Sequence, residues 1–196
     1  MMRRIRTNFI PTILNQKKWN KAGRTFITCY MKNTFILSVA ILALFSLSKV
    51  WADNAPGSEG SLAPAWKLQD LDGKTVSFDD FKSKVVILDF WATWCPPCRA
   101  EIPGLIDLQK AYGKQGLMVV GVSVDQGGAD VIKSFVEKFG MNYPVLVADD
   151  KVQQAFGGID AIPVTLVIDR QGRIVKRHLG LTEKDEFEAE IKPLLQ

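Results

Sequence analysis

The stretch ILDFWATWCPPCRAEIP, residues Ile87–Pro103, joins an apolar run to two closely spaced cysteines, Cys95 and Cys98. The apolar run begins earlier, as KVVILDFWA over residues 84–92, and is rich in β-branched and aromatic side chains. Such a continuous run is typical of a strand buried on both faces of a sheet. Apolar residues then recur at helical spacing, which predicts a helix over residues 96–112. The cysteines therefore stand where a buried strand leads into a helix.

The segments on either side alternate between strand and helix patterns. GLMVVGVSV (116–124) predicts a second buried strand, and DVIKSFVEKFG predicts a helix that ends at Gly140. Shorter strands are expected in KTVSF (74–78), in YPVLVA (143–148) and twice in PVTLVIDRQGRIVKRHLG (163–180), around a turn at 169–172. A last helix, with Thr182 and Asp185 as a capping box, should end near Pro193. This order predicts an α/β domain with a central mixed β-sheet and helices on both faces.

Residues 1–52 are expected to be a leader that directs the protein out of the cytoplasm. They contain an apolar segment, 35–48, that is shorter than the roughly 20 residues needed to span a bilayer. Val50 and Ala52 provide the small residues that a signal peptidase requires. We predict either a signal peptide cleaved after Ala52 or an uncleaved membrane anchor, with translation starting at Met1 or at Met31. A flexible linker (53–64) and a domain (65–196) should follow.

The charge of the chain is unevenly distributed. Residues 1–52 hold nine of the 25 Lys and Arg residues and none of the 21 Asp and Glu residues. The remaining chain is therefore net negative, which argues against nucleic acid as a partner. Because Cys29 lies in the leader, the exported protein should keep one cysteine pair in an oxidising, extracytoplasmic compartment.

The cysteine pair alone is compatible with several chemistries. A structural zinc site needs four ligands, and the single histidine, His178, gives the pair no second set of ligands, so we predict no zinc site. We expect His178 to be an ordinary surface or edge residue. Two thiolates suit Cu(I), so a copper-binding redox chaperone stays an alternative. A purely structural disulfide is disfavoured, because it would close only a very short loop.

The segment WCPPC (94–98), with Pro103 and IPVTLVID (162–169) downstream, resembles the thioredoxin superfamily. Within it, the chain is most similar to exported TlpA/ResA-like thiol–disulfide oxidoreductases, which have redoxin or AhpC/TSA-like domains. The resemblance covers about residues 63–196 and implies a thioredoxin-like fold. It also implies a redox-active Cys95–Cys98 disulfide and no other cofactor. At a helix N-terminus, Cys95 should be the partly exposed attacking sulfur, and Cys98 the resolving sulfur.

The same resemblance predicts how a client protein is held. It implies a cis peptide bond at Pro163, beside the cysteines, and backbone pairing between Ile162 and an extended client segment. Trp94 should be a wall residue that shields the nucleophile, and Pro96 and Pro97 should help to bind the client. Pro97 suits the first helical turn because its missing N–H has no helical partner there.

Two acidic residues are candidates for proton transfer. Asp89 lies inside the buried strand, where a carboxyl group should have a raised pKa and could act as the base for Cys98. The alternative is an Asp at a strand end that reaches solvent. Glu101 matches the acid in the C-x-x-C-x-x-E pattern of ResA-type relatives. Its alternative is an ordinary solvated residue in the first turns of a helix.

The intervening prolines indicate the direction of electron flow. They offer the thiolate neither a charge nor a backbone N–H, which predicts a reducing pair. The resemblance implies disulfide-bearing client proteins, such as apocytochrome c before haem attachment, and a membrane thiol carrier as the electron donor. A peroxiredoxin-like antioxidant enzyme is a further alternative. However, its P-x-x-x-[TS]-x-x-C pattern is absent, since Leu88 and Ala92 occupy the first and fifth places.

Overall fold

The computed structural model describes residues 57–196, so the predicted leader and the first residues of the linker lie outside the described residues. The described chain forms a seven-stranded sheet in the order β2-β1-β5-β4-β3-β6-β7. The strands are β1 (Lys67–Asp70), β2 (Thr75–Ser77), β3 (Val85–Trp91), β4 (Leu117–Ser123), β5 (Val145–Val147), β6 (Val164–Ile168) and β7 (Ile174–Leu179). β3, β4 and β5 run parallel, and the other pairs are antiparallel, which confirms the mixed sheet.

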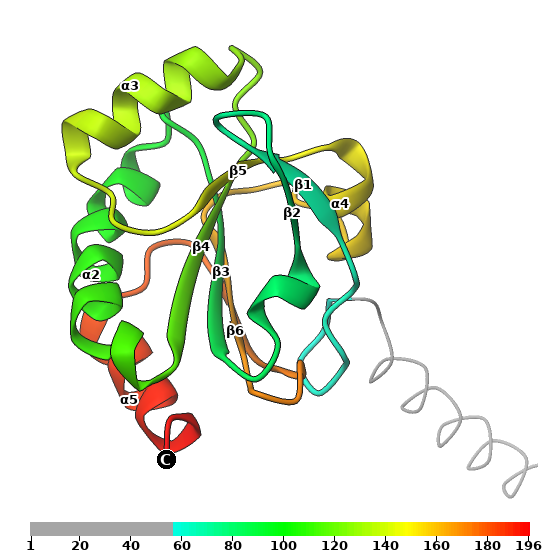
Figure 1. Ribbon diagram of the computed structural model, residues 1–196, viewed down its shortest axis with the longest axis vertical. Helices are drawn as coiled ribbons and strands as arrows, with labels where there is room; N and C mark the ends of the chain where they lie inside the picture. The colour runs from blue at the N-terminus through cyan, green and yellow to red at the C-terminus, as the bar shows by residue number, and fades with distance from the viewer. Residues whose placement is uncertain (1–56) are drawn as a thin grey trace, which may run out of the picture. The chain divides into compact units, whose positions relative to one another are not determined.

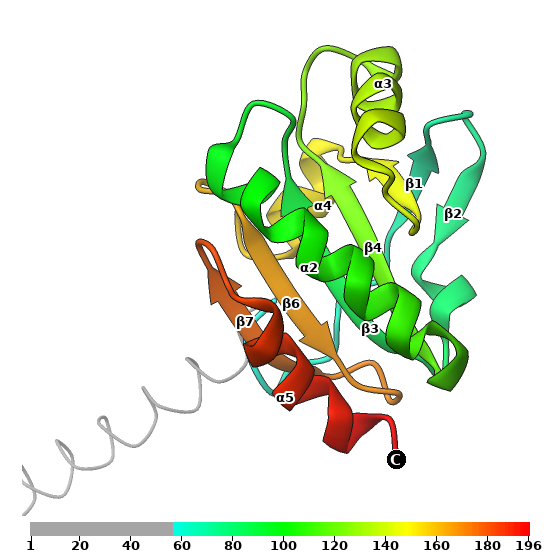
Figure 2. The same ribbon diagram turned by 90° about the vertical axis from the view of Figure 1, so that its left-hand side faces the viewer.

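Helices cover both faces of this sheet, as predicted. They are α2 (Pro96–Tyr112), α3 (Ala129–Phe139), α4 (Asp150–Ala155) and α5 (Lys184–Leu194), with two 3-10 turns, η1 (Phe78–Phe81) and η2 (Gly113–Gln115). α2 and α5 pack on one face, and α4 lies on the other (Figures 1 and 2). Along β3, Ile87 and Trp91 join the core under α2, whereas Val86 and Phe90 join the core under α4. Among the described residues, no helix is long and apolar enough to cross a membrane.

Three local predictions differ from the structure. The strand expected at 74–78 is shorter, because Phe78 already begins η1, and the short elements β1 and α4 were not predicted. The capping box at Thr182 is wrong, since α5 starts after Glu183 and has no side-chain cap. Instead, the Thr182 hydroxyl donates to the Gly180 carbonyl, and its N–H donates to Glu101.

The described part of the predicted linker is hydrogen bonded to the β6–β7 hairpin. Gly60 N–H donates to the Ile174 carbonyl at 2.7 Å, and Ala63 N–H donates to the Gly172 carbonyl at 2.8 Å. We call residues 57–63 the strap. Because β7 is the last strand of the sheet, the strap covers part of an otherwise open edge.

Arg177 of β7 anchors the beginning of the strap. Its guanidinium donates to the Gly57 carbonyl at 3.4 Å and to the Phe156 carbonyl, just after α4, at 3.0 Å. Partial burial lowers the pKa of Arg177. A single side chain thus joins the strap, α4 and the edge of the sheet.

We expect Arg177→Met to loosen the strap, because the apolar stem is kept while both guanidinium bonds are lost. Amide hydrogen exchange at Gly60 and Ala63 should become faster, and the free energy of unfolding should fall by about 1–2 kcal/mol. Arg173→Met is the matched control, since Arg173 makes only an exposed bond to the strap. Unchanged exchange in Arg177→Met would contradict this role.

Candidate active site

The turn between β3 and α2 places Cys95 at the start of the helix. Cys95 N–H donates to the Ala92 carbonyl at 3.2 Å, which closes the turn. Cys95 is then the N-cap of α2, and its Sγ atom accepts the Cys98 N–H at 3.3 Å. Pro96 and Pro97 fill the first two helical positions, where a missing N–H costs no helical hydrogen bond. The sulfur thus takes the place that a Ser or Asp oxygen takes in an ordinary cap.

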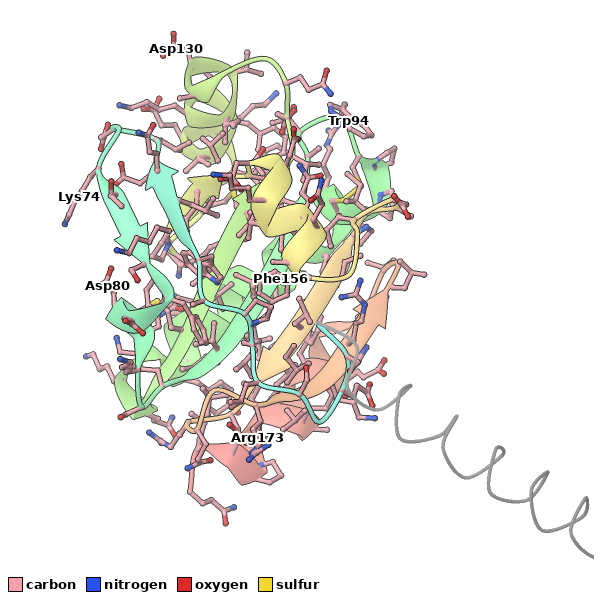
Figure 3. The ribbon with its side chains drawn as sticks, turned by 90° about the vertical axis from the view of Figure 1, so that its right-hand side faces the viewer. Lys74, Asp80, Trp94, Asp130, Phe156 and Arg173 are labelled. Atoms are coloured by element: carbon pink, nitrogen blue, oxygen red, sulfur yellow. A yellow bond between two sulfur atoms is a disulfide. The ribbon has the colours of Figure 1, made fainter. Side chains whose placement is uncertain are left out.

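The two cysteines form a disulfide, with sulfurs 2.02 Å apart and Cα atoms 5.3 Å apart. Cys98 is fully buried, and only 3% of Cys95 is exposed. The predicted partial exposure of Cys95 is therefore wrong in degree, although Cys95 is the more exposed of the two residues. Its neighbours are the exposed residues: Trp94 is 65% exposed and lies at the surface (Figure 3), and Pro96 and Pro97 are exposed beside it.

The loop before β6 brings a second segment to the cysteines. The Ile162–Pro163 peptide bond is cis, as the resemblance implied. The Ile162 carbonyl oxygen lies 3.8 Å from Cys95 Sγ, and the Pro163 carbonyl accepts the Gly180 N–H at 2.9 Å. In the reduced protein the Cys95 thiol could donate a hydrogen bond to the Ile162 carbonyl. The structure thus joins residues that are far apart in the sequence.

Asp89 lies in the middle of β3 and is almost fully buried. Its Oδ1 atom accepts the Thr165 hydroxyl at 3.3 Å across the β3–β6 pair, and its Oδ2 atom has no hydrogen-bond partner. Burial raises the pKa of Asp89. The alternative of a strand-end Asp in solvent is therefore excluded.

Glu101 lies on the buried side of α2, so the solvated alternative is excluded for this residue as well. Its Oε1 atom accepts the Thr182 N–H at 3.2 Å, and its Oε2 atom has no partner. Burial, and then the negative charge of Asp89, raise the pKa of Glu101. The two acids therefore interact, and each disfavours ionisation of the other.

Two aromatic residues complete this polar region. Trp91 Nε1 and the Tyr143 hydroxyl are buried without a partner, in the same core as the cysteines. Both rings lie over Gly121, the residue of β4 that pairs with Asp89: a Cβ atom there would be 2.9 Å from Trp91 Nε1 and 3.4 Å from Tyr143 Cε2. Burial, then the charges of Asp89 and Glu101, raise the pKa of Tyr143. Tyr143 was not predicted, because no local pattern connects it to the cysteines.

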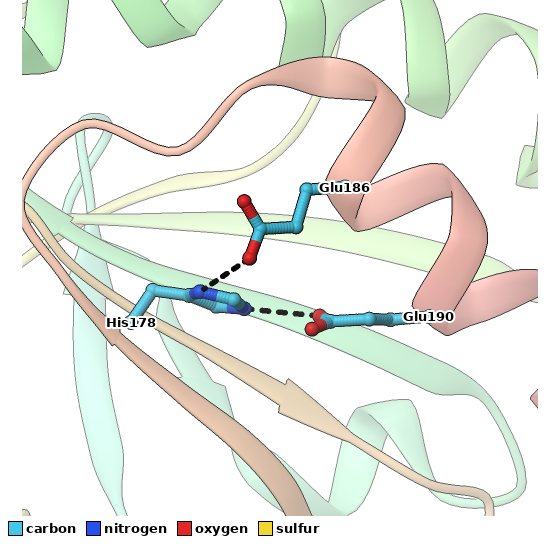
Figure 4. Close-up of side chains that lie close together, drawn as sticks. All are labelled: His178, Glu186 and Glu190. Carbon is cyan, nitrogen blue, oxygen red and sulfur yellow. Dashed lines mark hydrogen bonds and ion pairs between the residues drawn. The ribbon is translucent and has the colours of Figure 1, made fainter.

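His178 lies on β7, the last strand of the sheet, as the predicted edge position requires, but it makes more contacts than an ordinary surface residue. It joins β7 to α5, because Nε2 lies 2.9 Å from a Glu190 oxygen and Nδ1 lies 3.8 Å from a Glu186 oxygen (Figure 4). Its ring also packs edge-on against Phe187. These three polar side chains are close enough to hold a metal ion. However, Glu186 faces Nδ1 and Glu190 faces Nε2, whereas a metal ion would bind only one of these two ring nitrogens. We therefore interpret the arrangement as a structural contact between β7 and α5.

Comparisons with known proteins agree with this geometry. The model of the AhpC/TSA family matches residues 60–177. The thiol-disulfide oxidoreductase ResA of Bacillus subtilis (strain 168) is 35% identical over 158 residues, covering 80% of this chain and 85% of that protein. The ResA protein of Bacillus anthracis is 31% identical over 173 residues, covering 83% of this chain and 98% of that protein.

Solved structures show the same similarity. A thiol:disulfide interchange protein of the thioredoxin family from Chlorobium tepidum TLS has a TM-score of 0.65 and 34% identity, covering 71% of this chain and 99% of its own. A secreted thiol-disulfide isomerase from Corynebacterium glutamicum has a TM-score of 0.63 and 30% identity, covering 69% and 85%. Both similarities extend over most of residues 57–196.

We expect Asp89→Asn to stabilise the oxidised protein at neutral and alkaline pH. The folded pKa of Asp89 lies above its unfolded value of about 4, so the folded state binds more protons between the two values and stability falls as pH rises there. Removing the charge should add on the order of 2–4 kcal/mol at pH 8 and almost nothing below pH 4. Urea unfolding at several pH values measures the difference, with the exposed Asp107→Asn as control. If the variant were no more stable than the parent at pH 8, burial would not raise the pKa of Asp89 in the folded protein.

Proposed function

Because this chain belongs to the AhpC/TSA family and is a thiol–disulfide oxidoreductase, we propose that its Cys95–Cys98 pair reduces disulfides in client proteins. The supporting observation is the sparse stabilisation of the Cys95 sulfur. Helix α2 begins with two prolines, so the Cys98 N–H is the backbone donor that its first turn offers to the sulfur. A weakly stabilised thiolate makes the dithiol less stable relative to the disulfide, and therefore a better reductant.

The surrounding charges act in the same direction. Asp89 and Glu101 lie in the core under α2, and any negative charge on them disfavours a nearby thiolate. The adjacent cation, Arg99, lies over the Phe139 ring, with 5.7 Å between the guanidinium carbon and the ring centre. No histidine stands between the cysteines to stabilise the anion.

The proposed reaction follows from the places of the two cysteines in α2, with Cys95 as the N-cap and Cys98 inside the first turn. In the reduced protein, the Cys95 thiolate attacks a client disulfide, forms a mixed disulfide and releases one client sulfur as a thiolate. Cys98 then loses its proton and attacks Cys95 Sγ, which releases the second client sulfur and closes the Cys95–Cys98 disulfide. Two electrons pass to the client. We assign Asp89 to accept and return the proton of Cys98, because it is buried and its pKa is raised to about 7, near neutral pH. Glu101, whose pKa is raised further, would stay protonated beside it.

The client segment is held at the surface around Cys95. In our proposal it lies extended beside Ile162 and Pro163 and packs against Trp94, Pro96 and Pro97. The large exposed fraction of Trp94 supports this, since an exposed indole beside a reactive sulfur provides apolar contact area for a partner. The disulfide is the redox centre, and the proposed reaction uses no further cofactor.

The leader pattern supports an extracytoplasmic location. Residues 1–52 would either be removed or anchor the domain, and a membrane thiol carrier would reduce the pair again after each cycle. The similarity to ResA proteins supports a place in cytochrome c maturation, with apocytochrome c thiols as the product of the reaction.

The direction of electron flow is tested by the redox equilibrium of residues 53–196 with glutathione. We expect a reduction potential clearly below about −180 mV, on the thioredoxin side of protein disulfide isomerase. A value near −120 mV, typical of a strong oxidant, would overturn the reductant assignment while leaving the disulfide exchange activity intact.

The roles of the two sulfurs are tested by trapping. We expect Cys98→Ser to accumulate mixed disulfides with clients, because the resolving sulfur is missing, whereas Cys95→Ser should form none. Non-reducing gel electrophoresis followed by mass spectrometry measures the complexes and identifies the clients. If Cys95→Ser trapped clients and Cys98→Ser did not, the two roles would be reversed.

A further inference from the structure

A carboxylate from the neighbouring strand holds the turn that carries Cys95. Asp125, two residues beyond the end of β4, accepts the Thr93 N–H on Oδ2 at 2.9 Å and the Thr93 hydroxyl on Oδ1 at 2.6 Å. The Ser123 hydroxyl also donates to Oδ2, at 2.7 Å, and Ser123 Oγ accepts the Asp125 N–H at 3.1 Å. One carboxyl group thus accepts three hydrogen bonds, and both of its oxygens are used as acceptors.

The sheet explains why these residues meet. β3 and β4 are parallel, and Trp91 pairs with Ser123, so the carboxyl ends of both strands lie at the same edge. The Val124 N–H donates to the Trp91 carbonyl at 2.9 Å and extends the contact past the end of the ladder. Asp125 then faces Thr93, the second residue of the turn that ends at Cys95. Both hydrogen-bond donors of Thr93 are therefore tied to the rigid end of β4.

We propose that Asp125 is a positioning residue for thiol–disulfide exchange. By fixing Thr93, it holds the turn so that Cys95 Sγ keeps its hydrogen bond from the Cys98 N–H and its position beside the Ile162 carbonyl. A released turn would let the N-cap geometry of Cys95 relax, and the thiolate would lose its backbone donor. The inference rests on the exchange activity of the pair but not on the direction in which electrons flow.

Asp125→Ala tests the proposal, with Asp125→Asn as the conservative variant. An Asn side chain can still accept from Thr93 N–H and Ser123, and its amide can donate to the Thr93 hydroxyl, so it should keep most of the network. Asp169→Ala is the matched control. Asp169 Oδ1 accepts the Gln171 and Arg173 N–H groups at 2.9 and 2.8 Å, in the hairpin turn between β6 and β7.

The readouts are the free energy of unfolding and the pH dependence of Cys95 alkylation in reduced protein that also carries Cys98→Ala. Exchange with a model disulfide is measured in the proteins that keep both cysteines. In Asp125→Ala we expect a raised apparent pKa of the Cys95 thiol and exchange slowed by about tenfold, as for a misplaced reacting group. Asp125→Asn should keep both the apparent pKa of the Cys95 thiol and the exchange rate close to those of the parent. Asp169→Ala should be less stable than the parent, with an unchanged thiol pKa and an unchanged exchange rate.

Equal alkylation profiles and exchange rates for Asp125→Ala and Asp169→Ala, at comparable losses of stability, would overturn the positioning role. A failure of Asp125→Asn to restore the alkylation profile would also contradict it. A parent protein that exchanges disulfides but proves to be an oxidant would refute only the proposed direction, because the positioning role is judged from the differences between the variants and the parent.

Discussion

The hydrogen bond from the Cys98 N–H to the Cys95 sulfur depends on where α2 begins, and the site depends on that bond. A helix can take a cysteine as its N-cap here because a fully buried strand, β3, ends four residues earlier at Trp91. Two sets of hydrogen bonds hold the turn between them. The Ala92 carbonyl accepts the Cys95 N–H, and the Asp125 carboxyl group accepts both donors of Thr93. The reactive sulfur thus stands directly after a fully buried strand, while its neighbours Trp94, Pro96 and Pro97 are exposed.

The polar groups in the core under α2 oppose stability. Four buried polar groups there have no hydrogen-bond partner: Asp89 Oδ2, Glu101 Oε2, Trp91 Nε1 and the Tyr143 hydroxyl. Each such group lowers the free energy of unfolding by about 1–3 kcal/mol. Two hydrophobic clusters, one on each face of the sheet, offset this cost. A protein selected only for stability would fill this region with apolar side chains. Its retention of two interacting acids fits a need to move a proton to and from a buried thiol.

The sequence predicted the parts of the fold whose signal is local and long. The continuous apolar run of β3, the helical spacing of α2 and the stop at Gly140 all appear where expected, because burial on two faces and a left-handed C-cap leave clear patterns. β1 and α4 are short, with four and six residues, so each repeats its pattern too few times to be recognised. Tyr143 and Asp125 contribute to the site through the pairing of strands, which no local pattern reveals. An acid directly after a buried strand, as in GVSVD, was the available signal for Asp125.

The proposed reaction depends on attack by the Cys95 sulfur, which accepts a single backbone N–H, that of Cys98. Its most direct test is to reduce the protein, treat it briefly with a limiting amount of iodoacetamide and map the modified cysteine by mass spectrometry. We expect label to appear on Cys95 first, since Cys95 stands at the N-terminus of α2 beside exposed residues, whereas Cys98 lies inside the helix and is fully buried. Label that appears first on Cys98, or equally on both sulfurs, would contradict the account.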